Sequence, residues 1–215
     1  MNIELHHIEL ILLPHRALFL PAYKVLCIAD WHLGKAAHFR KSGIAMPQPL
    51  RDKGYGIIQN LIAEFDIDEI IFLGDLFHSS ENNDWNLFRE FILQSSGIGF
   101  VLIKGNHDII AKEKFEEIGI KVKDEQVVDD RIIFTHHPLF ENNLSTRLNI
   151  AGHIHPGYAV AQKGKQKFRL PAFYHSRQTL VLPAFGEFTG LQVVKEKQGD
   201  DFFCIAGDDI IKIRH

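Results

Sequence analysis

The sequence has little cysteine, no long apolar run and no excess of positive charge, and each absence narrows the range of functions. Cys27 and Cys204 are the only cysteines among 215 residues. Both lie in apolar runs, which favours small core residues in a reducing compartment over a disulfide framework. No apolar stretch reaches transmembrane length. The formal net charge of -3 gives no general attraction to nucleic acid, so contact with DNA would require a local basic patch.

The N-terminal residues also differ from a secretion signal. Glu4, His6, His7 and Glu9 stand where a signal peptide would have a basic start and a clean apolar run. No linker, low-complexity tract or repeat divides the chain, and its length is sufficient for one substantial core. We therefore expect residues 1–215 to form a single soluble domain in the cytoplasm.

Apolar runs that end directly in Asp, Asn or His recur five times between residues 25 and 155. The runs are short and rich in Ile, Val, Leu and Phe, which is typical of buried strands. Their lengths predict strands over Val25–Ala29, Ile70–Leu73, Phe100–Ile103, Ile132–Phe134 and Leu148–Ala151. The segments that follow them are Asp30-Trp31-His32, Gly74-Asp75, Gly105-Asn106-His107-Asp108, Thr135-His136-His137 and Gly152-His153-Ile154-His155.

Helical spacing of apolar residues separates these runs. It predicts helices over Leu50–Phe65, over Trp85–Leu93 with Asp84 as the N-cap, and over Lys112–Ile118. Alternating strands and helices indicate an α/β domain, in which ligands gather beyond the carboxyl ends of the strands. The five polar endings should therefore converge. The chain after Pro156 has no long helix and predicts strands over Tyr158–Ala161, Thr179–Leu182, Gly190–Val194, Phe202–Ile205 and Ile210–Ile213.

The side chains at these endings form a set of oxygen and nitrogen donors without cysteine. Such a set suits Mn²⁺, Fe or Zn²⁺ better than Cu(I) or an iron–sulfur cluster. A carboxylate can bridge two ions, and two ions about 3.5–4 Å apart can hold the attacking and leaving oxygens of an in-line phosphoryl displacement. The pattern thus predicts a two-metal phosphoesterase.

In their order along the chain, the blocks Asp-x-His, Gly-Asp, Gly-Asn-His-Asp, His and Gly-His-x-His resemble the calcineurin-like metallophosphoesterase superfamily. The resemblance implies an α/β (α+β) fold in which a β-sandwich of two mixed sheets is flanked by helices (four-layer αββα), with two divalent ions, Mn²⁺ before Fe or Zn²⁺. One ion would be held by Asp30, His32 and His155, the other by Asn106, His136 and His153, and Asp75 would bridge them.

The same resemblance gives roles to residues that are not metal ligands. His107 resembles the histidine that protonates the leaving-group oxygen, and Asp108 resembles the residue that orients it. His136 is preferred to His137 as a ligand because it follows the strand directly. His78 is open between a supporting role and an ordinary surface position.

Three further segments resemble one subfamily, the ligase-associated DNA damage response endonucleases. They are Asp30–Lys35, Phe39–Gly43 and Leu182–Gly190, and Trp31 departs from the Leu expected in the first of them. This resemblance implies a bacterial protein that acts on phosphodiesters with Mn²⁺, together with a DNA ligase and other repair factors.

Basic residues offer two candidate substrate contacts. Lys35, Arg40 and Lys41 follow the first ligand pair and suit substrate phosphates, or form an ordinary solvated loop. A second strip, with Phe168 among Lys163, Lys165, Lys167 and Arg169, suits single-stranded nucleic acid or is an exposed hairpin.

Three functions remain in competition at this stage. The first is a phosphodiesterase or endonuclease acting on DNA, and the second is a phosphoesterase acting on nucleotides or phosphomonoesters, which the acidic net charge favours. The third is a non-enzymatic scaffold, which the complete set of ligands argues against.

Overall fold

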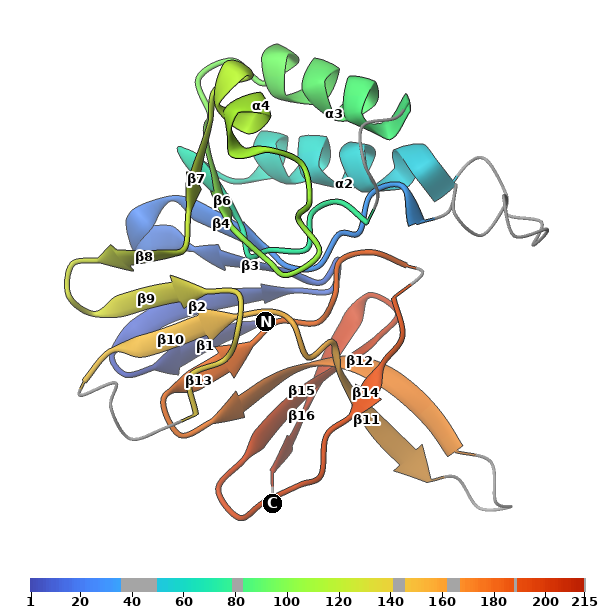
Figure 1. Ribbon diagram of the computed structural model, residues 1–215. Coiled ribbons are helices and arrows are strands. Elements are labelled where there is room, and N and C mark those ends of the chain that lie inside the picture. Colours follow the sequence, from blue (N-terminus) through green and yellow to red (C-terminus); the bar gives the residue numbers. More distant parts are fainter. Residues whose placement is uncertain (36–49, 79–82, 141–145, 162–166, 188, 215) are drawn as a thin grey trace.

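Two mixed β-sheets pack face to face, and helices cover the outer face of the first (Figure 1). The computed structural model describes residues 1–35, 50–78, 83–140, 146–161, 167–187 and 189–214. The two mixed sheets expected from the sequence are confirmed, and the helices of the described residues flank the first sheet, without the second helical layer of a four-layer αββα arrangement. Among the described helices, none has the length and apolar character needed to cross a membrane.

The first sheet has seven strands in sequential order. The strands β1 to β4 are antiparallel neighbours, and β4 to β7 run parallel to one another. The carboxyl ends of β4, β5 and β6 therefore meet at one edge. The bounds are β1 (Asn2–Leu5), β2 (Ile8–Leu13), β3 (Ala17–Leu20), β4 (Val25–Ile28), β5 (Glu69–Phe72), β6 (Gly99–Ile103) and β7 (Ile120–Lys123).

The second sheet has nine strands, with β14-β11-β12-β13-β10-β9-β8 as its main order. The strand β15 pairs with β12 and with β16, while β9, β10 and β13 run parallel. The bounds are β8 (Glu125–Val128), β9 (Ile132–Thr135), β10 (Leu148–Ala151), β11 (Pro156–Ala161), β12 (Lys167–Ser176), β13 (Thr179–Val181), β14 (Gln192–Val193), β15 (Asp201–Ala206) and β16 (Asp209–Arg214).

The core between the sheets is apolar because alternate side chains of each strand point inward. In β4, Cys27 faces the second sheet, whereas Leu26 and Ile28 face the helices. Inward residues of the second sheet, such as Phe134 and Phe203, complete this layer. Both cysteines are buried and free, as their apolar surroundings predict.

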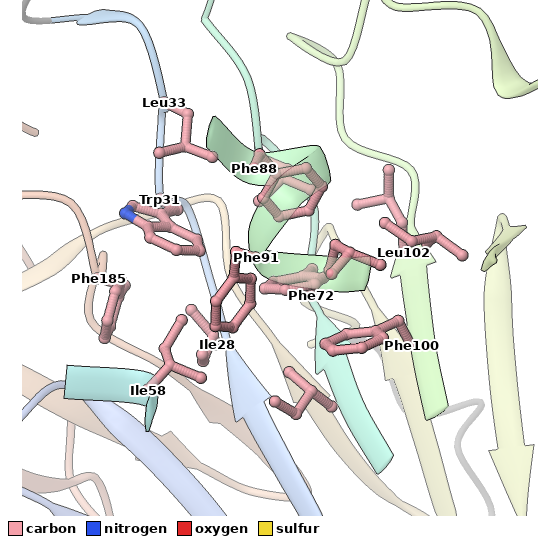
Figure 2. Packing of buried hydrophobic residues seen from close by; sticks show 14 of the residues in the cluster. Ile28, Trp31, Leu33, Ile58, Phe72, Phe88, Phe91, Phe100, Leu102 and Phe185 are labelled. Carbon is pink, nitrogen blue, oxygen red and sulfur yellow. The ribbon is translucent and has the colours of Figure 1, made fainter. Parts of the chain in front are cut away.

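The helices α2 (Leu50–Glu64), α3 (Asn83–Gln94) and α4 (Lys112–Glu117) bury an aromatic layer on the first sheet (Figure 2). Phe72 of β5 lies at its centre, with ring centroids 5.8 Å from Phe88 and 6.3 Å from Phe100. A short 3-10 helix (Pro21–Tyr23) joins β3 to β4. The outer face of the second sheet carries a smaller apolar cluster, and no helix of the described residues packs on it.

Trp31 connects this aromatic layer to the loop that follows β4. Its ring centroid lies 4.9 Å from that of Tyr55 and 5.2 Å from that of Phe185. Gly54 of α2 makes this packing feasible, since a Cβ there would lie 2.8 Å from two atoms of the indole. The residue that departs from the expected Leu is therefore anchored in the core, as Figure 2 shows.

The sequence-based boundaries hold to within one or two residues for the strands β4, β5, β6, β9, β10 and β13, and for α2 and α4. The expected N-cap at Asp84 is wrong, because α3 begins at Asn83 and places Asp84 in its first turn. The apolar runs did not predict β1, β2, β7, β8 and β12, which carry outward-facing polar residues or lie at the sheet edges. They also did not predict β3, a buried apolar strand of four residues inside the first sheet.

We expect Phe72→Ala to lower the free energy of unfolding by about 3–5 kcal/mol, because it leaves a void in a layer from which water is excluded. Urea denaturation followed by circular dichroism measures this change. Phe168→Ala is the control, since Phe168 is 51% exposed. Equal losses from the two substitutions would contradict the assignment of Phe72 to the centre of the core.

Candidate metal centre

Five loops meet above the sheets because their preceding strands are parallel. Asp30 and His32 follow β4, Asp75 follows β5, and Asn106 follows β6 in the first sheet. His136 follows β9 in the second sheet, and the adjacent β10 leads to the loop that holds His153 and His155. The structure thus brings the seven expected ligands together although 125 positions separate the first from the last.

One group of donors consists of Asp30, His32 and His155. The Nε2 atoms of the two histidines lie 3.4 Å apart, and His155 Nε2 lies 3.4 Å from Asp30 Oδ1. The other carboxylate oxygen, Asp30 Oδ2, accepts a hydrogen bond of 2.9 Å from the backbone amide of His153. This bond fixes the carboxylate while leaving Oδ1 directed at the imidazoles.

A second group gathers around His136. Its Nε2 lies 3.0 Å from Asn106 Oδ1 and 3.2 Å from His153 Nδ1. Its Nδ1 lies 2.8 Å from the backbone oxygen of Leu73, which can only accept, so Nδ1 carries the proton and donates it. The lone pair of Nε2 therefore faces the other donors, an arrangement common in metal-binding histidines.

Asp75 lies between the two groups. Its Oδ1 is 3.5 Å from His136 Nε2, and its Oδ2 is 3.9 Å from His32 Nε2. Oδ1 also accepts a hydrogen bond of 2.9 Å from the backbone amide of His107. Each carboxylate oxygen therefore faces a different group, which is the position that a bridging ligand requires.

The donor atoms fit divalent cations because they face one another at short distances and carry too few hydrogens to form hydrogen bonds among all of them. Asp30 Oδ1 is buried and, among the described residues, accepts no hydrogen bond, although His155 Nε2 lies 3.4 Å away. Burial of such a carboxylate oxygen is costly unless a cation is present. Burial lowers the pKa of His32 to about 3, even though Asp75 raises it. The pKa of His153 is also lowered, mainly by burial and to a smaller extent by the nearby His136. Neutral imidazoles with available lone pairs are the form that binds metal.

Five of the seven expected ligands have left-handed backbone conformations. The φ angles are 52° at Asp30, 53° at His32, 49° at Asp75, 71° at His153 and 51° at His155. This region costs about 1–2 kcal/mol for a residue with a Cβ. Each turn reverses the chain just past a strand and aims a side chain back at the centre, so the sheets impose the ligand geometry.

The loop after β6 approaches Asp75 so closely that only glycine fits at position 105. A Cβ on Gly105 would overlap both the amide nitrogen and the carboxylate of Asp75. The same loop is tied to the loop after β5 by Asp108. Its Oδ1 accepts bonds of 2.8 Å and 3.2 Å from the amides of Leu76 and Phe77, and its Oδ2 accepts one of 2.9 Å from Gly105.

Asp108 therefore does not make the contact that the resemblance implies, in which it would orient the ring of His107. Within the described part of the chain, its hydrogen bonds go to backbone amides and none goes to His107. Burial raises the pKa of Asp108, and these amide bonds oppose that effect. The imidazole of His107 is exposed and lies 5.8 Å, between ring centroids, from His32. Asp108 positions the loop that carries His107 rather than the ring itself.

Two histidines outside the expected ligand set border the centre. The ring of His78 lies 5.7 Å from His32 and 5.6 Å from His107. The exposed His137 lies 4.1 Å from the ring of His153 and can offer a donor atom together with His136. In the sequence, the only indication of a role for His78 and His137 was that they lie close to Asp75 and His136. Such proximity does not show whether a histidine binds metal or only lies beside the ligands.

A cavity of about 520 Å³ opens beside the centre. His32 and Lys35 both line it, so the structure places Lys35 in the same cavity as one expected ligand. Arg40 and Lys41, the other expected phosphate contacts, lie outside the described residues, as do Lys163 and Lys165 of the second basic strip. Phe168 and Arg169 of that strip are exposed on β12.

Comparisons with known proteins agree with this geometry. The family model described as calcineurin-like phosphoesterase matches residues 23–181. The solved nuclease MPE of Pseudomonas putida is 28% identical, with 99% of each chain covered and a TM-score of 0.82. Yfce, a phosphoesterase from E. coli, is 13% identical over 88% of this chain and 97% of its own, with a TM-score of 0.45. No curated protein gave a significant match.

We expect Mn²⁺ to raise the melting temperature of metal-free protein, because an ion that binds only the folded state adds about 2.7 kcal/mol at 100 times its Kd. Asp75→Asn should abolish this response, since Asp75 faces both donor groups. Differential scanning fluorimetry measures the shift, and Asp66→Asn on the surface is the control. A normal Mn²⁺ response in Asp75→Asn would contradict the bridging position.

Proposed function

Because the chain belongs to the calcineurin-like phosphoesterase family and is therefore a metal-dependent phosphoric ester hydrolase, we propose that it is a Mn²⁺-dependent phosphodiesterase that cleaves DNA as an endonuclease. The observation that carries the proposal is the likeness to a nuclease over 99% of both chains. Two donor groups that share Asp75 support phosphodiester chemistry, because such chemistry needs charge on both sides of the phosphorus.

The proposed ligands are those of the two groups. Asp30, His32 and His155 would hold one ion, Asn106, His136 and His153 would hold the other, and Asp75, which faces both groups, would serve both. When bound, two such ions supply Lewis-acid charge to the phosphoryl oxygens and activate water for in-line attack. The carboxylate, amide and imidazole donors, without thiolate, suit Mn²⁺, Fe or Zn²⁺, and Mn²⁺ is proposed first because of the resemblance to the ligase-associated subfamily.

His107 is the proposed general acid. Its amide is fixed by the bond to Asp75, and its ring stands exposed beside His32, on the side where a leaving group would depart. A protonated imidazole there donates its proton to the leaving alkoxide as the phosphorus–oxygen bond breaks. Asp108 supports this step by holding the loop through three amide bonds.

A phosphoesterase acting on nucleotides or phosphomonoesters is the second candidate. The cavity of about 520 Å³ beside His32 favours it, because that volume lies in the range of small-molecule sites. The net charge of -3 favours it as well. A non-enzymatic scaffold would not need the buried Asp30 Oδ1, which accepts no hydrogen bond from the described residues and whose desolvation a cation would offset.

Three wider proposals accompany the activity. Residues 1–215 act as one domain, which is supported by an apolar core that both sheets share. Association with a DNA ligase and repair factors rests on the resemblance of Leu182–Gly190 and the two segments after β4 to the ligase-associated subfamily. A cytoplasmic location follows from that role.

The direct test is Mn²⁺-dependent cleavage of supercoiled and single-stranded circular DNA, with a chromogenic phosphodiester assayed in parallel. Circles have no ends, so nicking them identifies endonuclease activity. Hydrolysis of the chromogenic diester without cleavage of any DNA form would refute the DNA substrate and favour nucleotides.

We expect His107→Gln to slow DNA cleavage by about 10²–10⁴-fold, the usual contribution of a general acid. Metal content, measured by elemental analysis, should stay at the wild-type level, because the ring of His107 is not a proposed ligand. His7→Gln is the matched control, since His7 is exposed in the turn after β1. Loss of metal from His107→Gln would refute its role as a non-ligand.

A further inference from the structure

The cavity beside the metal centre is lined by three cations and by the carboxylates of Asp84, Glu187 and Asp208, and the cations come from three distant parts of the chain. Arg16 comes from the turn between β2 and β3, Lys35 from the loop after β4, and Lys53 from α2. His32 lines the same cavity, so a substrate whose scissile phosphate lies at the metals has its neighbouring groups in this space. Pro14, Pro171 and Phe185 supply apolar walls.

Arg16 is held rigidly while most of its donors remain available. Its Nη1 lies 3.3 Å from the backbone oxygens of both Ala184 and Gly186. A guanidinium has five N–H groups, so the remaining ones can bind an anion in a planar fork. Burial lowers the pKa of Arg16, as it does that of Lys35, and among the described ion pairs neither residue has a partner. Both are cations that a bound anion would stabilise.

Glu187 neutralises part of this charge. Its carboxylate forms an ion pair of 2.5 Å with Lys53 Nζ, which joins the segment after β13 to α2. It also acts on the charge of Arg16, whose pKa it raises. The side chains of Lys53 and Glu187 are 56% and 36% exposed, and pairs this exposed contribute little to stability. Another anion can therefore replace Glu187 at small cost.

We propose that Arg16 and Lys53 form a subsite for a second phosphate of the substrate, next to the scissile one, and that the carboxylate of Glu187 occupies this subsite until substrate displaces it. This inference rests on the proposed phosphodiesterase function and deepens it by naming the feature that selects the substrate. A phosphate replaces the carboxylate because it offers three acceptor oxygens to the same donors, whereas a substrate without a second phosphate leaves Glu187 in place.

The test uses paired thymidine p-nitrophenyl phosphodiesters, with and without a second phosphate on the other hydroxyl of the deoxyribose. Both isomers are assayed, so either direction of the strand is covered. Wild type should prefer the phosphate-bearing member of one pair by about tenfold in kcat/KM, which is the scale of one hydrogen bond to a charged group. Glu187→Gln should increase this ratio by lowering KM, and Lys53→Met and Arg16→Gln should reduce it.

A binding measurement separates the subsite from catalysis. Fluorescence anisotropy of a labelled thymidine oligonucleotide with metal-free protein should show tighter binding by Glu187→Gln and weaker binding by Lys53→Met. Asp66→Asn breaks the comparable surface pair of Asp66 with Lys24 Nζ, at 2.7 Å, and should leave both measurements unchanged. Lys53→Met also keeps the test valid if Arg16→Gln fails to fold.

Equal activity of wild type on both members of each pair, or weaker oligonucleotide binding by Glu187→Gln, would overturn the subsite. If the protein leaves DNA intact but still prefers substrates with a second phosphate, DNA is not the substrate. The proposed subsite would still stand in that case.

Discussion

The crowding of unprotonated donors around Asp75 is the constraint on which the rest of the structure depends. Two buried carboxylates and several imidazoles lie within a few ångströms, and Asp30 Oδ1 accepts no hydrogen bond from the described residues. Such an arrangement is unfavourable without a cation. Two sheets packed through an apolar core hold it in place, because parallel strands deliver each donor from a separate, fixed direction.

The strands that carry the expected ligands and the composition of the centre could be predicted because both are local signals. An apolar run followed by Asp or His is readable in ten residues, and parallel pairing brings such endings together. The hydrogen bonds of Asp108 could not be read in this way, because they reach Leu76 and Phe77 across more than 30 positions. The same holds for Arg16, whose carbonyl partners lie 168 and 170 positions away.

The left-handed conformations of five ligands were also invisible to pattern reasoning. Glycine and asparagine are the usual indications of such turns. Asp30, His32 and Asp75 indicate metal binding in the sequence but not a left-handed backbone conformation. Residues held in this region persist when the surroundings determine them, and here the adjoining strands do so. The second basic strip differs, because its composition could be recognised from the sequence. Phe168 and Arg169 are exposed, but the sequence does not show where they lie relative to the metal centre.

The contact between Trp31 and Gly54 has a consequence for how this chain could have evolved. A methyl group at position 54 would collide with the indole, so the tryptophan is acceptable only in a chain that already has glycine there. Positions 31 and 54 are therefore coupled, and a path of single substitutions that leads to this pair avoids the collision only if glycine is present at position 54 before tryptophan reaches position 31.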